Sequence, residues 1–195
     1  MKKFSAVLVG LAMVTALAAC GKQPVEDITA TKAAVEAAAG EGAAKYVAAD
    51  YKKVNDELAA ALAEVKVQDE KWFKNYDKAK QLLATAKTDA EALKVKTIAE
   101  KERLKQQSIA DLAAAQAGVA AAKAELATAP KGKGTAADIA AMGADVAGLE
   151  AALAEIQPLI DSGEFMAASE KAVAINDKAA AIAAEVAAVK AKKKK

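Results

Sequence analysis

The feature that most constrains the fold is a series of apolar residues repeated at alternating steps of four and three residues. Such spacing places them on one face of an α-helix that packs against another helix at a shallow angle. Roughly three residues in ten are Ala, the strongest helix former. The sequence therefore predicts an all-α fold of elongated antiparallel helical hairpins or a bundle with coiled-coil-like packing. The first stripe is Val47, Tyr51, Val54, Leu58, Ala61 and Val65, and the second is Trp72, Tyr76, Ala79, Leu83, Ala86, Ala90 and Leu93.

Few residues interrupt this helical pattern. No Gly or Pro lies between Trp72 and Gln116, so we expect one very long helix that starts at Trp72 and ends before Pro130. The spacing slips near Thr97 and then resumes. Its third stripe is Ile109, Leu112, Gln116, Val119 and Leu126. Further breaks are expected at 40–42, at 129–134, and at Pro158 with 161–163, and the last helix is expected to begin at Phe165.

An internal repeat indicates two helical hairpins. The segment 60–65 recurs at an offset of 91 residues as 151–156, and 77–79 matches 170–172 at an offset of 93. We expect a first hairpin over 43–128 with an overlong second helix, a Pro/Gly linker over 129–134, and a second hairpin with a Lys-rich tail over 135–195. Residues 1–19 and 20–42 precede them as signal peptide and tether.

The N-terminus has the pattern of a secretion signal. Lys2 and Lys3 precede an uncharged apolar run over 4–16, which is shorter than the ~20 residues that span a bilayer. The next four residues resemble the lipobox of bacterial lipoproteins: Leu17, Ala18, Ala19 and Cys20.

The lipobox resemblance implies an address and a chemical modification. It implies cleavage before Cys20, a diacylglyceryl thioether on its sulfur, and acylation of the new amine. Several acyl chains hold a protein stably on a bilayer. In lipoproteins of enteric bacteria, Asp after the Cys favours the inner membrane. Gly21 is compatible with an outer-membrane lipoprotein that faces the periplasm.

Short motifs in the first hairpin resemble a second family. Gly42–Tyr46, Leu58-x-x-Ala61, Tyr76–Ala79 and Ala86-x-x-Asp89-Ala90 resemble a bacterial family of Ala-rich helical-hairpin domains of unknown function. Many of its members are envelope lipoproteins. The resemblance covers roughly 33–95 and, more weakly, 135–190. Residues 161–172 also resemble the turn of a tetratricopeptide hairpin, but tandem repeats near 34 residues are lacking.

Composition excludes several functional classes. The chain has no His and a single Cys, so zinc, copper and His-dependent catalytic sites are not expected. Neither an enzyme nor a cofactor is expected. Of 28 basic residues, Lys2 and Lys3 leave with the signal, and the remaining 26 balance 26 acidic residues. Because five lysines lie in the last six positions, the body is mildly acidic, which argues against nucleic-acid binding.

Three aromatic residues are candidates for a binding patch. Trp72, Phe73 and Tyr76 cluster at one end of the first hairpin. The structural interpretation is that they plug this end, where Ala cannot fill the space. The functional interpretation is an exposed platform for a ligand or a partner protein. Trp72 and Phe73 are adjacent and cannot both face one core line.

The terminal lysines Lys192, Lys193, Lys194 and Lys195 allow three interpretations. They can form a solvated helix end, favoured by the helix dipole. They can contact anionic envelope polymer or lipid. The chain also resembles Braun-type lipoproteins, which implies attachment of Lys195 to peptidoglycan. The sequence thus favours a lipid-anchored envelope scaffold or spacer, the alternatives being a chaperone-like binding adaptor and a peptidoglycan tether. Self-association is compatible with the stripes.

Overall fold

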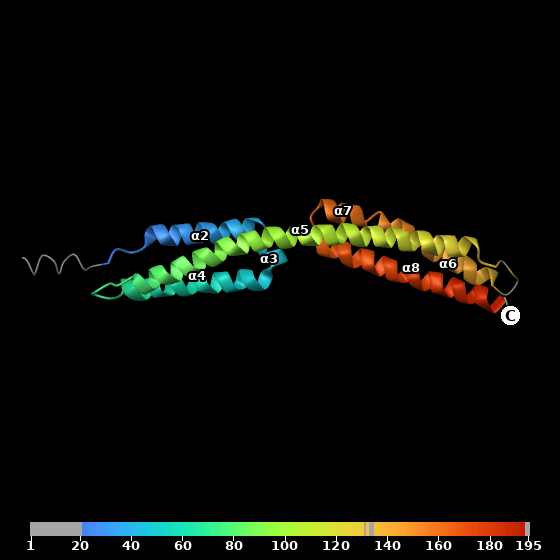
Figure 1. The fold of residues 1–195 in the computed structure, drawn as a ribbon. Coiled ribbons are helices and arrows are strands. Elements are labelled where there is room, and N and C mark those ends of the chain that lie inside the picture. The colour runs from blue at the N-terminus through green and yellow to red at the C-terminus, as the bar shows by residue number, and fades with distance from the viewer. Residues whose placement is uncertain (1–20, 131, 133–134, 194–195) are drawn as a thin grey trace, which may run out of the picture. The chain divides into compact units, whose positions relative to one another are not determined.

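The computed structural model describes residues 21–130, 132 and 135–193, with side chains described as far as Ala191. The part of the chain so described contains no strand, which confirms the predicted all-α class. Its helices, labelled as in Figure 1, are α2 (Val25–Gly40), α3 (Ala43–Tyr46), α4 (Ala48–Asp69), α5 (Asp77–Ala127), α6 (Ala136–Leu153), α7 (Ile156–Asp161) and α8 (Phe165–Lys193).

The chain divides into two compact units between Lys101 and Glu102. Unit 1 contains α2, α3, α4 and the first part of α5. Unit 2 contains the rest of α5 together with α6, α7 and α8. We expected the division at 129–134, but the structure places it inside α5. The reason is that the overlong helix supplies one packed helix to each unit.

Unit 1 packs α2, α4 and α5 around a core of small and branched side chains. Val35 of α2 and Val54 of α4 belong to the same buried cluster as Ala90 and Leu93 of α5. The hydroxyl of Thr31 on α2 also donates to the backbone carbonyl of Leu83 on α5, at 3.2 Å. The segment 20–42, expected to be a tether, therefore contributes a packed helix, because Thr31, Val35 and Ala38 lie on one buried face.

The first two predicted stripes form the buried faces of α4 and α5. In the first, every position is buried or partly buried. In the second, Tyr76, Ala79, Leu83, Ala86, Ala90 and Leu93 are each at most 3% exposed. Trp72 does not belong to the second stripe. It is 88% exposed because α5 begins only at Asp77.

The third stripe is confirmed at Leu112 and Val119, which are buried, and is wrong by one residue at its other two main positions. Ile109 is 43% exposed and Gln116 is exposed, whereas Ser108 and Ala115 are fully buried. The inward-facing positions run from Thr97 through Lys101, Leu104, Ser108 and Leu112, of which Lys101 and Leu104 are partly buried and the others buried. Thr97 and Ser108 are eleven residues apart, which is three helical turns rather than the two turns of a heptad. An eleven-residue repeat rotates the buried face relative to a strict seven-residue repeat.

Unit 2 packs α5, α6 and α8 in the same manner. Lys123 of α5 forms an ion pair with Glu150 of α6 at 2.6 Å, and Glu125 of α5 pairs with Lys190 of α8. The core is built from apolar residues of four helices. Its buried members include Leu112, Ala115, Val119, Ala122, Val146, Leu149, Ile156, Ile160, Phe165, Ala168, Ala172, Ile175, Ala179, Ile182 and Val186.

Two predicted breaks are turns that depend on glycine. Gly42 has φ +96° and Gly163 has φ +79°, in the left-handed region that favours Gly. After α7 the amide of Gly163 donates to the carbonyl of Ile160 at 3.0 Å, and that of Glu164 donates to Leu159 at 2.7 Å. This bond pair is the Schellman arrangement, which ends α7 before α8 starts.

The expected break at Pro158 differs from the structure. α6 already ends at Leu153, and Pro158 lies in the first turn of the short helix α7. At that position the missing N–H group of proline leaves no helical hydrogen bond unmade.

The internal repeat recurs as a three-dimensional contact. In unit 1, Lys78 of α5 pairs with Glu64 of α4 at 2.8 Å. In unit 2, Lys171 of α8 pairs with Glu155, the residue just before α7. Glu155 lies 91 residues after Glu64, and Lys171 lies 93 residues after Lys78, which are the two offsets of the sequence repeat. The α4–α5 and α6–α8 hairpins are thus built on the same plan.

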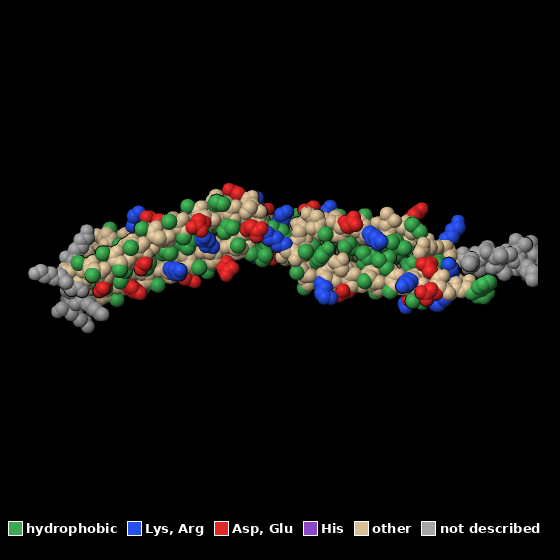
Figure 2. Space-filling model, turned by 180° about the vertical axis from the view of Figure 1, so that it is seen from behind, with side chains coloured by type: hydrophobic (Ala, Val, Ile, Leu, Met, Phe, Trp, Pro, Cys, Tyr) green, Lys and Arg blue, Asp and Glu red, His purple; other side chains and the backbone are tan. Residues whose placement is uncertain are grey.

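One side of unit 1 leaves apolar surface accessible. Figure 2 shows hydrophobic side chains in a strip between α2 and α4, bordered by charged side chains. In the same unit, Ala34, Tyr51 and Leu58 are only partly buried where they pack against the core cluster. The three helices therefore cover this face less completely than they cover the stripe on α5.

Glycine replacement tests the packing of α5 against α8. A Cβ atom at Gly148 on α6 would meet nothing within 4 Å, so we expect Gly148→Ala to raise the free energy of unfolding by about 0.5–1 kcal/mol. A Cβ atom at Gly118 on α5 would overlap the side-chain oxygen of Asn176 on α8. Because of this overlap, we expect Gly118→Ala not to raise the free energy of unfolding. Urea denaturation followed by circular dichroism compares the two, and equal stabilisation would contradict the packing described.

Candidate functional site

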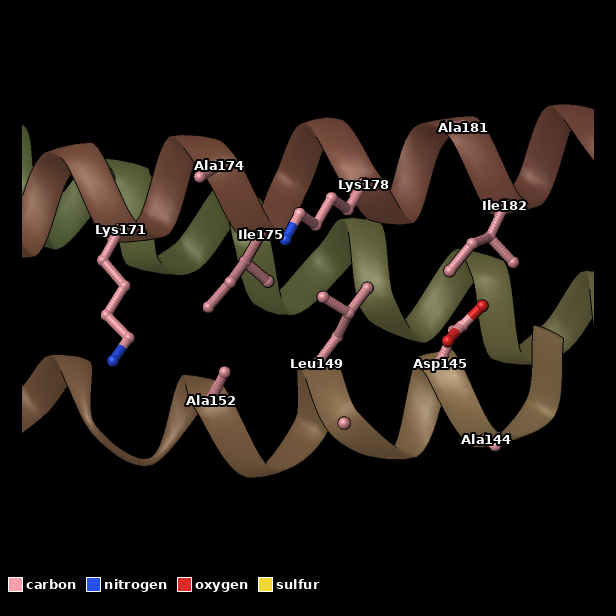
Figure 3. A pocket seen from close by; sticks show the side chains of 11 residues that line it. Ala144, Asp145, Leu149, Ala152, Lys171, Ala174, Ile175, Lys178, Ala181 and Ile182 are labelled. Carbon is pink, nitrogen blue, oxygen red and sulfur yellow. The ribbon is translucent and has the colours of Figure 1, made fainter. Parts of the chain in front are cut away.

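An open apolar groove lies between α6 and α8 of unit 2 (Figure 3) and has a volume of about 680 Å³. Leu149 of α6 points into the space between the two helices, as do Ile175 and Ile182 of α8. Small side chains form most of the remaining wall, whereas the three floor residues are themselves buried, with exposed fractions of 8% for Leu149, 4% for Ile175 and 9% for Ile182. The other lining residues are Ala144, Asp145, Gly148, Ala152, Lys171, Ala174, Lys178 and Ala181.

The equivalent groove of unit 1, between α4 and α5, is smaller and is bridged by charged side chains. Its volume is about 210 Å³. Lys53 Nζ lies 2.8 Å from Asp89 Oδ2, and Lys96 Nζ lies 2.7 Å from Asp50 Oδ2. Lys53 also pairs with Glu57 at 3.1 Å along α4. These long side chains cross from one helix to the other and occupy the groove.

The repeat shows which substitutions distinguish the two grooves. At the offset of 91, Lys53 corresponds to Ala144 and Glu57 to Gly148. At the offset of 93, Asp89 corresponds to Ile182. Charged, groove-filling residues of unit 1 are thus replaced in unit 2 by small or apolar ones. The same holds for the second bridge, where Asp50 and Lys96 correspond to Ala141 and Val189.

These groove residues were not singled out from the sequence. The signal that could have found them is the repeat itself. When the two hairpins are aligned position by position, the loss of paired charges in the second copy predicts an uncovered apolar face.

The bridge of unit 1 perturbs the groups that form it. The hydrogen bond from Lys53 holds the pKa of the Asp89 carboxyl below its usual value, and the charge of Lys53 acts in the same direction. The hydrogen bond to Asp89 likewise raises the pKa of Lys53, with a smaller contribution from Glu57. At neutral pH both groups are charged, and the bridge is formed. Because the bridge is exposed to water, it contributes little to the free energy of unfolding. Its main effect is to fill the groove of unit 1.

A second candidate surface is the loop between α4 and α5. Trp72 is 88% exposed and Phe73 is 81% exposed, whereas Tyr76 is only 3% exposed. The Tyr76 hydroxyl donates to the carboxylate of Asp69, and Tyr76 packs beside Val65. The plug interpretation therefore holds for Tyr76 and is wrong for Trp72 and Phe73, because only Tyr76 is buried.

The loop is held in place by polar contacts. The Gln68 side chain, which is buried, accepts a hydrogen bond from the backbone amide of Asn75 at 3.3 Å. The side-chain oxygen of Asn75 in turn accepts from the amide of Asp77 at 2.8 Å, at the first residue of α5. With the Tyr76–Asp69 bond, these contacts fix both ends of the segment that carries Trp72 and Phe73.

The first described residues of the chain lie against this loop. The amide of Gly21 donates to the carbonyl of Lys74 at 3.3 Å. The Gln23 side chain donates to Asp69 Oδ2 at 2.9 Å. A Cβ atom at position 21 would come within 3.0 Å of the Lys74 oxygen and 3.3 Å of the Tyr76 ring, so Gly21 allows this close approach.

The remaining candidate residues from the sequence fall outside what can be described. Leu17, Ala18, Ala19 and Cys20 precede the described residues. The backbone of α8 includes Lys192 and Lys193, but their side chains, like Lys194 and Lys195, are not described. Lys190, just before them, pairs with Glu125 and bonds to the hydroxyl of Thr128 on the α5 side of unit 2.

Neither a metal cluster nor a membrane-spanning helix is found in the described residues. Within 21–130, 132 and 135–193, no three carboxylate or thiol side chains come close enough to hold a metal ion. No helix in that part of the chain is long and apolar enough to cross a bilayer. Comparison with family models, with curated proteins and with solved structures gives no match.

Proposed function

We propose that this chain is a lipid-anchored cell-envelope protein that serves as a helical scaffold or spacer. The observation that carries the proposal is the lipobox over residues 17–20, which follows two lysines and an apolar run of signal-peptide length. Acylated Cys20 anchors the helical body to the outer membrane, and the body projects into the periplasm.

The structural role is supported by how the apolar residues are used. The stripes on α4 and α5 are buried by packing between helices of the same chain. A scaffold that folds without a partner requires such packing.

Replacing Cys20 tests the anchor. In bacteria that express the full chain, we expect Cys20→Ser to lose fatty-acid labelling and to retain the signal peptide on a denaturing gel. A matched control, Thr15→Ser, also introduces a serine but keeps the lipobox. It should behave as the parent chain. If Cys20→Ser is processed and labelled like the control, the proposal of a lipoprotein is wrong.

A second role, as an interaction module, is favoured by the groove between α6 and α8. Its two walls are antiparallel helices, and its floor of Leu149, Ile175 and Ile182 suits the apolar face of an amphipathic helix. Exposed Ala and Gly positions along the walls allow the close approach of another helix. Lys178 at the rim favours an acidic residue on that helix. The proposed occupant is therefore an amphipathic helix of another envelope protein.

Site-specific photo-crosslinking tests this second role. A photoreactive residue at Ala144 lines the groove, whereas one at Ala147 lies on an exposed part of the same helix away from it. In cells, we expect adducts from position 144, mapped by mass spectrometry to an amphipathic helical segment, and few from position 147. Equal adduct formation at both positions, or adducts to unrelated segments, would contradict the role of the groove.

A further inference from the structure

The loop between α4 and α5 presents two large aromatic side chains that the fold does not use. Trp72 and Phe73 are the most exposed large hydrophobic side chains described, at 88% and 81%. Both lie within one short loop whose ends are fixed by Tyr76 and Asn75. Adjacent aromatic residues held out into solvent expose apolar area at a cost, which is recovered when that area is covered.

The same loop lies next to the start of the described chain. Gly21 is hydrogen-bonded to Lys74, which directly follows Phe73 in the sequence. Cys20 is covalently joined to Gly21, and one residue spans at most about 3.8 Å between Cα atoms. Acyl chains on the Cys20 sulfur would therefore begin within a few residues' length of the two aromatic side chains.

We propose that Trp72 and Phe73 insert into the interfacial layer of the membrane that holds acylated Cys20. This inference rests on the proposed lipidation and goes beyond it, because it assigns a lipid-binding function to a loop 50 residues away in sequence. Trp is favoured at the headgroup level because its ring is apolar and its N–H is polar. The apolar ring of Phe73, the next residue, inserts beside it.

The charges around the aromatic pair fit a bilayer surface. Lys71 and Lys74 flank Trp72 and Phe73 on either side, so their ammonium groups can reach lipid phosphates while the aliphatic stems lie along apolar surface. The covalent anchor keeps the loop at a high local concentration near the bilayer. The loop then fixes the orientation of unit 1 on the membrane, which a lipid anchor at Cys20 alone would not determine.

Tryptophan fluorescence tests the insertion directly, because Trp72 is the only Trp of the chain. The acylated full-length protein is added to preformed vesicles of phosphatidylethanolamine and phosphatidylglycerol. We expect the Trp72 emission to shift to shorter wavelength, to be quenched by lipids brominated on their acyl chains, and to lose most of its accessibility to aqueous iodide.

The control moves the only indole to the other end of α4. In Trp72→Phe with Ala49→Trp, the new Trp is at an exposed position about 30 Å along α4 from the loop, and it should stay accessible to iodide and unquenched by brominated lipid. If the parent protein sediments with vesicles but Trp72 behaves like this control, the insertion is wrong and the anchor stands. If the acylated protein fails to sediment with vesicles, the anchor and the insertion are both wrong.

Discussion

The structure depends on the close approach of helices along alanine. On α5, Ala79, Ala86 and Ala90 are completely buried in unit 1, and Ala115 and Ala122 are completely buried in unit 2. Alanine buries little apolar area, so each alanine contact contributes little to the free energy of unfolding. The helices must therefore be long enough to make many such contacts. A single long helix that serves both units provides this length. Larger side chains such as Leu83 and Leu93 are buried between these alanines along α5, and Tyr76 packs beside Val65 where the hairpin ends.

The two units show how one hairpin plan gives two different surfaces. Both retain a Glu–Lys pair at the turn end, Glu64 with Lys78 and Glu155 with Lys171. Away from the turn, unit 1 bridges its groove through Lys53 and Asp89, whereas the corresponding positions of unit 2 are Ala144 and Ile182. A charged bridge exposed to water adds little stability, so exchanging it costs the fold little and frees the groove for another use.

The sequence predicted the helices and most of the buried face, because the spacing of apolar residues determines both. It could not predict the register near Ser108, where small residues are buried and Ile109 is exposed, since hydrophobicity alone favours the larger residue. It also could not decide whether Trp72 was core or surface. That depends on where α5 begins, which the Asn75 cap sets. The contact between Gly21 and the loop links segments far apart in the sequence and leaves no periodic signal.

The central claim is that the groove of unit 2 is open because the side chains that fill its counterpart are missing. A fluorescence titration with an environment-sensitive apolar dye tests it when the unit 1 residues are transplanted, as Ala144→Lys with Gly148→Glu and Ile182→Asp. The account predicts that dye binding falls while helical content by circular dichroism is kept, and that the reciprocal change in unit 1, Lys53→Ala with Glu57→Gly and Asp89→Ile, raises it. Dye binding unchanged in both variants would contradict the account.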